Sequence, residues 1–358
     1  MSGPVAIIDP PGDAVLMHVA SPGFRATKPD IISLERTPAS VFAAVAAQRE
    51  PVFAARTVTA WLLHDVFVAC EGLVFDRHGA LYRPSITQHA QAEIDWAAGQ
   101  VRAAIAGATV PEHDGPLVLG KKRGAANYGH WLMEMLPMLH LVMARVQGER
   151  TGVLVHDVGD PQLGEVMQSS MRLAGIADAQ VRVSNQFPVR VRRLILVDGL
   201  TRHGTYMSPL VRTCHERLAH DISGTGHERV FVARGSGMRR DFARAAELEA
   251  SAEKQGFHVL RTAGTTLVQQ IAAMRDARVI VGAMGAAMTS IAFARPSAQV
   301  LVFAGAAMPD TFFWFIANQF GHRYREIRCR QKEGEPDASY DRDLLITDDE
   351  FGHHLAAA

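Results

Sequence analysis

The sequence predicts an α/β fold divided into two domains. Its 358 residues exceed the usual size of one domain. Short apolar segments typical of strands alternate with segments of helical period, as in parallel sheets with crossover helices. In the second half these β-α units repeat in a Rossmann-like manner. We therefore expect an N-terminal domain at 1–205, a C-terminal domain at 206–330, and a tail at 331–358 that packs on the N-terminal domain.

In the first half, residues 1–55 mix Pro-Gly turns with short apolar runs and predict only loose organisation. Beyond them, strands are predicted at residues 61–70, 72–76, 116–120, 151–157 and 192–199. Helices are predicted at residues 91–107 and 161–176, each with a glycine at or near its end. The alternation indicates a layer with a parallel sheet.

In the second half, strands are predicted at residues 228–235, 257–262 and 298–304. Helices are predicted at residues 209–222, 243–256, 266–277 and 310–322. Residues 278–294 predict a strand, a glycine turn and a helix in succession, and a mixed, acidic tail follows the last helix.

Charge and composition exclude several classes of function. A formal net charge of zero argues against a protein that binds nucleic acid through a broad basic face. Residues 181–240 nevertheless hold eleven arginines against four acids, which suits an anionic small ligand, although a solvated surface explains it equally well.

Cellular location is predicted from cysteine use and from apolar runs. Cys70, Cys214 and Cys329 form no CxxC pair, which fits a reducing compartment and gives no zinc signature. The N-terminus has no secretory signal pattern, and the longest uncharged stretch, 279–294, is too short to span a bilayer. We expect a cytoplasmic protein without a transmembrane segment.

The segment "NYGHWLMEMLP" places an ionisable pair in apolar surroundings. With Asn127 near the N-cap of a helix, His130 and Glu134 share one face at i and i+4. Histidine titrates near neutral pH and accepts a proton from a hydroxyl, and the glutamate orients the ring or acts as the base itself. By spacing alone, the rim of an amphipathic helix is the more frequent explanation.

Two further segments suit a phosphate group. In "VFVARGSGMRR", Arg234 follows a strand, and Arg239 and Arg240 come shortly after it. The carboxyl ends of strands bind ligands in open α/β sheets, and the planar guanidinium fits phosphate oxygens. Common surface arginines are the alternative.

In "VIVGAMGAAMTS", Gly282 and Gly285 lie between a strand and a helix, whose free amides favour phosphate. Tight packing of strand and helix explains the glycines about as well. The spacing is not GxGxxG, and no acidic residue ends the next strand, so a nicotinamide dinucleotide oxidoreductase is disfavoured.

Together these segments resemble glycosyltransferase family 61, which includes capsular polysaccharide biosynthesis proteins. The resemblance rests on "NYGHWLMEMLPML", on "VFVAR" with the following "RR", on the block from Thr265 to Phe303, and on "FFWFIANQFGHRYREI". It covers about Asn127 to Ile327, and the combination is far more specific than any single segment.

The resemblance implies an inverting glycosyltransferase, a hexosyl- or pentosyltransferase of bacterial polysaccharide biosynthesis. Its expected fold is GT-B-like, with two Rossmann-like domains facing each other across a cleft. The implied partners are a nucleotide sugar and a glycan or lipid-linked acceptor; no cofactor, metal or nucleic acid is expected. Peripheral membrane association and homo-oligomer formation stay open.

The resemblance also implies roles for individual residues. His130 and Glu134 are the expected catalytic pair, lining the cleft, and either is a candidate for the base that deprotonates the acceptor. The expected acceptor-side residues are Asn127, Tyr128 and Trp131. The expected donor-binding residues are Arg234, Arg239, Arg240, Met284, Gly285, Ala286 and Ala287.

The sequence departs from the family pattern on the donor side. Met284, Gln269 and Ser290 stand where the family usually has histidine, glutamate and asparagine, and the Asn-Glu expected after Arg240 is missing. Methionine donates no hydrogen bond to phosphate or sugar. The alternative function is therefore a catalytically altered protein of the same fold that binds nucleotide sugars or serves in assembly.

Overall fold

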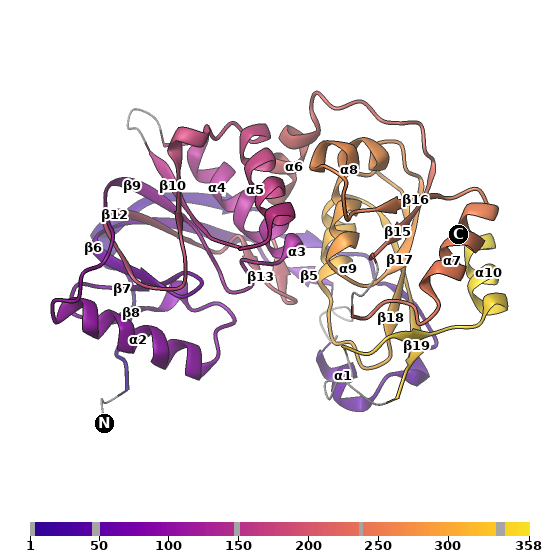
Figure 1. Ribbon diagram of the computed structural model, residues 1–358, viewed down its shortest axis with the longest axis horizontal. Helices are drawn as coiled ribbons and strands as arrows, with labels where there is room; N and C mark the ends of the chain where they lie inside the picture. Colours follow the sequence, from indigo (N-terminus) through magenta and orange to yellow (C-terminus); the bar gives the residue numbers. More distant parts are fainter. Residues whose placement is uncertain (1–3, 45–50, 147–150, 236–238, 334–340) are drawn as a thin grey trace. The chain divides into compact units, whose positions relative to one another are not determined.

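The computed structural model describes residues 4–44, 51–146, 151–235, 239–333 and 341–358. It is a mixed α/β structure with parallel and antiparallel strands (Figure 1). The chain forms two compact units that are discontinuous in sequence. The first comprises Met1–Pro22, Ala55–His203 and Ser208–Arg217, and the second comprises Gly23–Ala54, Gly204–Met207 and Leu218–Ala358. The expected continuous domain over 1–205 thus lacks residues 23–54, which pack with the second half of the chain.

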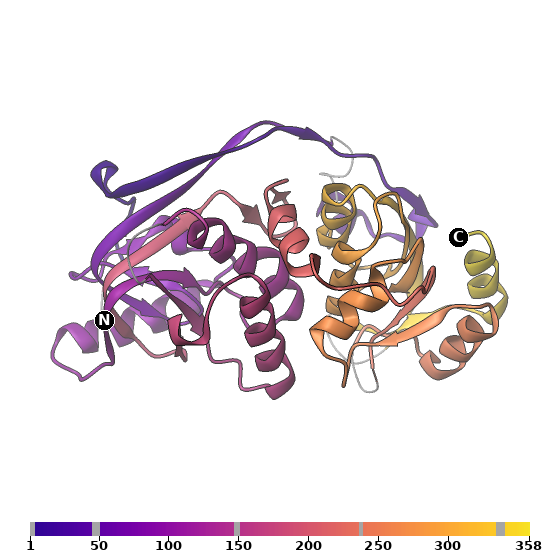
Figure 2. The same cartoon turned by 90° about the horizontal axis from the view of Figure 1, so that it is seen from above.

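The first unit is built on a mixed sheet. Its strands are β1 (Ile7–Ile8), β2 (Val15–Ser21), β6 (Arg56–Ala69), β7 (Leu73–Phe75), β8 (Leu81–Tyr82), β9 (Glu112–Gly120), β10 (Gly152–His156), β11 (Val181–Ser184) and β12 (Val189–Asp198), and β13 (Thr201–Arg202) follows outside the sheet. The sheet order is β1-β8-β7-β6-β12-β9-β10-β11, and β2 runs antiparallel beside β6 (Figure 2). Only part of this sheet is parallel, because β6 pairs antiparallel with β2, β7 and β12. The expectation of a parallel layer here is wrong for that half of the sheet.

Helices of the first unit follow the apolar period of the sequence. They are α2 (Gln91–Ile105), α3 (Tyr128–His130), α4 (Leu136–Met143), α5 (Pro161–Leu173) and α6 (Val211–Ala219), and the last extends two residues into the second unit. Short 3-10 turns cover Gly12–Ala14, Arg83–Ser85 and Asp178–Gln180. Helix α2 buries Ile94, Ala97 and Val101 against Phe67 and Phe75 of β6 and β7.

The second unit contains the regular β-α repeat that the sequence predicts. Its strands are β3 (Phe24–Arg25), β4 (Asp30–Ile32), β5 (Val52–Phe53), β14 (Tyr206–Met207), β15 (Arg229–Ala233), β16 (His258–Arg261), β17 (Val279–Ala283), β18 (Gln299–Gly305), β19 (Arg323–Gln331) and β20 (Leu344–Leu345). Its helices are α1 (Ala39–Ala44), α7 (Ala245–Lys254), α8 (Leu267–Met274), α9 (Phe312–Gln319) and α10 (Asp348–Ala356), with 3-10 segments at Leu34–Arg36 and Ala286–Phe293.

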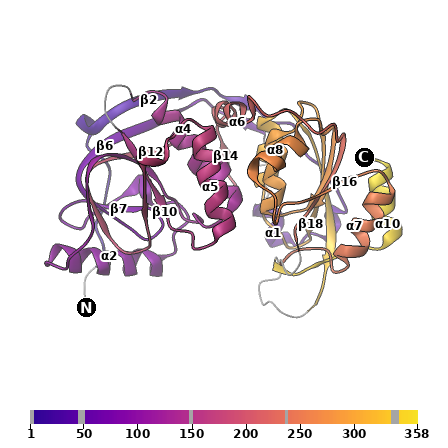
Figure 3. The same cartoon turned by 45° about the horizontal axis from the view of Figure 1, so that its top comes forward.

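The main sheet of this unit has the order β16-β15-β17-β18-β19, and all of these neighbours are parallel. Numbered along the chain, this is the 2-1-3-4-5 order of doubly wound folds. Helices α7 and α10 lie on one face, and α8 lies on the other (Figure 3). Phe351 and Leu355 of α10 are buried in one core with Phe231 and Phe303 of the sheet.

The C-terminal region differs from its prediction. Residues 323–331 form strand β19 inside the sheet, with β18 on one side and β4 on the other. Charged side chains at alternate positions hid this strand from a search for apolar runs. The expectation that the tail returns to the N-terminal domain is wrong, because α10 belongs to the core of the second unit.

Candidate active site

The helix that carries His130 and Glu134 is interrupted by a π-helical turn. Asn127 caps its start by accepting hydrogen bonds from the amides of Gly129 (2.8 Å) and His130 (3.3 Å). Residues Trp131–Met135 are π-helical, and the backbone N–H of Leu136 donates to the carbonyl of Trp131. Pro137 has no N–H for an ordinary helical bond, and its ring crowds the carbonyl four residues back, which favours the wider turn. Such turns recur at functional sites.

Glu134 lies between two histidines of the first unit. Nδ1 of His203, in the turn after β13, bonds to Glu134 Oε1 at 2.8 Å, and Nδ1 of His130 lies 3.1 Å from the same oxygen. The two imidazole rings stack with centroids 4.3 Å apart and planes at 19°. The Glu134 side chain is 5% exposed, whereas His130 and His203 are 16% and 19% exposed. Both rings can therefore be reached from solvent, but the carboxylate cannot.

The environment of Glu134 favours its ionised form. Burial raises the pKa of Glu134, but the adjacent His130 and His203 rings and the charge of Lys122 outweigh burial and hold the pKa well below its ordinary value. A carboxylate with a depressed pKa is a poor general base near neutral pH. Because a carboxylate only accepts hydrogen bonds, Nδ1 of His203 carries the hydrogen in its bond to Glu134, which leaves Nε2 of a neutral His203 ring with its lone pair.

The backbone around His130 fixes the position of its ring. A Cβ atom at Gly124 would lie 3.1–3.2 Å from three atoms of the His130 imidazole. Gly124 also has a positive φ of 87°, and its amide donates to Glu71 Oε2 at 2.9 Å. Any larger residue at position 124 would push the ring and strain the backbone.

The same three side chains form a candidate metal site among the described residues, because one ligand atom from each lies within 4.8 Å of the others. A metal ion binds an imidazole nitrogen in the plane of the ring. The position that both Nδ1 atoms face is occupied by Glu134 Oε1, at 2.8 Å from His203 and 3.1 Å from His130. The carboxylate would have to move for an ion to bind both Nδ1 atoms at that position.

Arg234 and Gly285 of the second unit meet at the point where the strand order reverses. Arg234 follows β15, and Met284 and Gly285 follow β17, the neighbouring strand of the sheet. In doubly wound folds the ligand binds at the carboxyl ends of these two central strands. The structure thus brings together two segments that are 50 residues apart in the chain.

The guanidinium of Arg234 is buried without a direct carboxylate contact in the described part of the chain. Its Nη1 donates to the carbonyl of Met284 at 3.0 Å, and its Nε has no hydrogen-bond partner there. Burial and the charge of Arg240 lower the pKa of Arg234 to about 10, against the opposing charges of Asp241, Asp343 and Asp341. The group therefore stays cationic at neutral pH, and its burial is best compensated by an anion.

Gly285 makes room for this guanidinium. A Cβ atom at position 285 would lie 1.1 Å from Nη1 and 2.3 Å from Cζ of Arg234. The backbone at Gly285 is extended, with φ of 172°, so the requirement for glycine here is steric and not conformational. The guanidinium of Arg234 therefore keeps its position only while residue 285 is a glycine.

The remaining donor-side candidates make other contacts in the structure. Arg239 and Arg240 each face Asp341, at 3.5 and 3.6 Å, so their charges are already partly balanced. Met284 is 2% exposed, and its amide donates to the carbonyl of Phe303. Ala286 and Ala287 open the segment Ala286–Phe293, which is a 3-10 helix where a regular helix was expected.

The acceptor-side candidates differ in how deeply their side chains are buried. Trp131 is completely buried, and its indole Nε1 donates to Ser170 Oγ at 2.9 Å, so it points into the core and not toward an acceptor. Asn127 uses its side-chain oxygen as the helix cap. Tyr128 is partly exposed, lies two residues before His130 in the sequence, and stays a candidate for acceptor binding.

Two candidate site residues were not identified from the sequence. His203 lies 69 residues after Glu134, in a turn without a recognisable motif, and only the folded chain brings it to the pair. Lys122 influences Glu134 by charge, and its Nζ donates to Thr201 Oγ1 at 3.3 Å. A histidine next to glycine directly after a strand is the sole local signal for the first of these.

Comparison with known proteins supports the assignment to a family. Residues 128–301 match the family model Glycosyltransferase 61, and this range contains His130, Glu134, His203, Arg234 and Gly285. Curated proteins gave no match to the chain. No helix in the described residues is long and apolar enough to cross a membrane. The match spans both groups of site residues, and residues 128–301 of the chain accordingly belong to the glycosyltransferase 61 family.

Proposed function

We propose that the protein transfers a sugar from a nucleotide-sugar donor to a hydroxyl group of a glycan or lipid-linked acceptor, with inversion at the anomeric carbon. The observation that carries the proposal is the buried carboxylate of Glu134, which orients two partly exposed imidazoles. Buried Arg234, at the switch point of a doubly wound sheet, supports the donor side of the same reaction.

On the acceptor side, a histidine of the group His130, Glu134 and His203 is the base. The acceptor hydroxyl loses its proton to Nε2 of one imidazole while its oxygen forms a bond to the anomeric carbon. Glu134 holds the opposite nitrogen and stabilises the imidazolium that forms, as the carboxylate of other histidine-carboxylate pairs does. The low pKa of Glu134 argues against the assignment of the carboxylate itself as base.

On the donor side, the bond between the anomeric carbon and the phosphate oxygen breaks, and a nucleoside diphosphate leaves with the electron pair. Arg234 and the first amides after Gly285 stabilise the growing negative charge. With positive groups already at the leaving group, the reaction needs no metal ion. A GT-B arrangement of the two units would let the nucleotide sugar and the acceptor bind next to each other.

The biological setting belongs to the proposal as well. The family resemblance points to bacterial polysaccharide biosynthesis, with a hexose or pentose as the transferred sugar. The cysteine pattern favours the cytoplasm as the place of reaction.

A panel of nucleotide sugars, each with and without acceptor, tests the activity. In the productive pair, His130→Ala, His203→Ala and Glu134→Gln should each lower kcat by roughly 10²–10⁴-fold. A double variant should be little slower than its slower single, since the three side chains act together. His64→Ala, at an exposed histidine of β6, is the matched control and should keep full activity. Near-normal turnover in all three site variants would remove this group from catalysis.

The second candidate function is a binding or assembly protein that keeps the fold without turnover. Met284 favours it, because a buried methionine stands where the family usually has a histidine. The same panel decides: a nucleotide sugar that binds the wild-type protein, with neither hydrolysis nor transfer to any acceptor, would support the second candidate over the first.

A further inference from the structure

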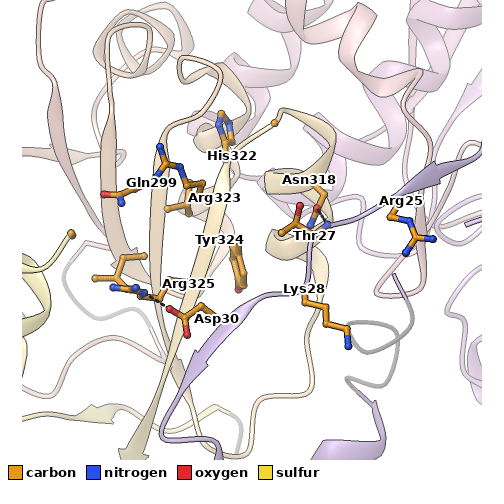
Figure 4. Close-up of a pocket in the computed structure, with 14 residues that line it drawn as sticks. Arg25, Thr27, Lys28, Asp30, Gln299, Asn318, His322, Arg323, Tyr324 and Arg325 are labelled. Carbon is orange, nitrogen blue, oxygen red and sulfur yellow. Dashed lines mark hydrogen bonds and ion pairs between the residues drawn. The ribbon is translucent and has the colours of Figure 1, made fainter. Parts of the chain in front are cut away.

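A pocket of about 530 Å³ lies within the second unit, apart from the switch-point site (Figure 4). The first residues of β18 and β19 and the segment from Arg25 to Asp30 line it. Arg234 follows the carboxyl end of β15 in the same parallel sheet, whereas this pocket lies at the amino ends of β18 and β19. Its volume falls in the range of small-molecule sites, about 300–1,000 Å³.

The wall of the pocket is anchored to the unit by specific bonds. The Thr27 amide donates to Asn318 Oδ1 at 2.6 Å, and the Thr27 carbonyl accepts from Trp314 Nε1 at 2.8 Å. Asp30 pairs with Arg325 at 2.7 Å, and β4 continues from there beside β19. The segment 25–30 is thus held in place over the sheet.

Several polar groups of this pocket have no protein partner in the described part of the chain. The cations of Arg25, Lys28 and Arg323 contact no carboxylate there, and the pocket's only acidic side chain, Asp30, already pairs with Arg325. The hydroxyl of Thr27 and the amide of Gln299 also make no hydrogen bond to described residues. Figure 4 shows that these groups come from the anchored segment and from the two strands.

We propose that this pocket binds an anionic sugar, a saccharide that carries a carboxylate or a phosphate group. Guanidinium groups recognise both anions with paired hydrogen bonds, and the unused hydroxyl and amide suit sugar hydroxyls. Val300, Leu301 and Tyr324 line the pocket beside these polar groups and offer apolar surface to a sugar ring. The pocket is too large for phosphate alone. This site goes beyond the proposed reaction, because it uses none of the residues assigned to it.

Calorimetric titration of the full-length chain tests the proposal. The probes are digalacturonic acid, glucose 6-phosphate, the neutral disaccharide maltose, and inorganic phosphate. We expect at least one of the two anionic sugars to bind, more tightly than maltose or phosphate and more weakly as salt rises. Equal affinity for maltose would overturn anion recognition, and equal affinity for inorganic phosphate would overturn the sugar. Absence of binding by both anionic sugars at millimolar concentration would overturn the site.

Variants locate the binding. Arg323→Ala and Lys28→Ala should each weaken the bound anionic sugar at least about tenfold, and both are exposed side chains whose loss leaves the fold intact. Arg330→Ala, an exposed arginine at the other end of β19, is the matched control and should change nothing. Affinity for a nucleoside diphosphate should stay unchanged in all three. Unchanged affinity for the sugar in Arg323→Ala and Lys28→Ala would place its site elsewhere and overturn the proposal, whatever the fate of the transferase activity.

Discussion

Replacement of Gly285 by alanine should act through a clash between the new Cβ atom and the guanidinium of Arg234. The new Cβ would lie 1.1 Å from Nη1 of Arg234, so the guanidinium cannot keep its place. Its bond to the Met284 carbonyl, at 3.0 Å, is then lost. A hydrogen bond from a charged group contributes about 1.5–3 kcal/mol. The backbone itself tolerates alanine, because φ at this position is extended.

Two quantities should change together in Gly285→Ala. The affinity for a nucleoside diphosphate should fall about 10–100-fold, as in Arg234→Ala, because both changes remove the same cation from the site. The free energy of unfolding should fall by about 1–3 kcal/mol, since the displaced guanidinium must find another place in a packed region. Calorimetry measures the first quantity and urea denaturation measures the second.

The double variant separates this explanation from simple damage. With Arg234→Ala already present, Gly285→Ala should cost less than about 0.5 kcal/mol in unfolding free energy and nothing further in affinity, because no clash remains. Gly352→Ala, in α10, is the matched control, since the nearest atom to its new Cβ is 3.8 Å away. Additive losses in the double variant, or full nucleotide affinity in Gly285→Ala, would refute the reasoning.

Three further predictions test other parts of the structure. Trp131→Phe should lower the free energy of unfolding by about 1–2 kcal/mol through loss of the bond to Ser170, with kcat retained; a normal stability with lost activity would return Trp131 to the acceptor side. Activity should persist in EDTA; loss that manganese or zinc restores would show that His130, Glu134 and His203 rearrange to bind a metal ion. The pKa of Glu134 is lower in the folded than in the unfolded chain, so its contribution to stability is present above its ordinary pKa of 4.5 and is lost as pH falls below that value. Between pH 6 and pH 3 the free energy of unfolding, measured by chemical denaturation, should therefore fall by at least about 1 kcal/mol less in Glu134→Gln than in the wild-type protein. An equal fall in both proteins would contradict the depressed pKa.

The active-site candidates differ in how far the sequence could identify them. His130 and Glu134 share a helix, so a spacing of four predicts their contact directly. Arg234 and Gly285 each follow an apolar strand, and parallel neighbours bring such ends to one edge of a sheet. His203 gives no such signal, because its approach to Glu134 depends on the path of the chain through β12 and β13.

The sequence by itself determined the order of strands and helices in most of the chain, together with the pair on the helix and the arginine and glycine at the strand ends. These features follow from local periodicity and from residues near each other along the chain. The tertiary structure alone decided three others: that 23–54 and 348–356 join the second unit, that β19 is an inner strand, and that His203 completes the group around Glu134. The reason is that strand pairing and packing join residues that are far apart in sequence. Local pattern states which face of a segment is apolar, but not which distant segment will cover it.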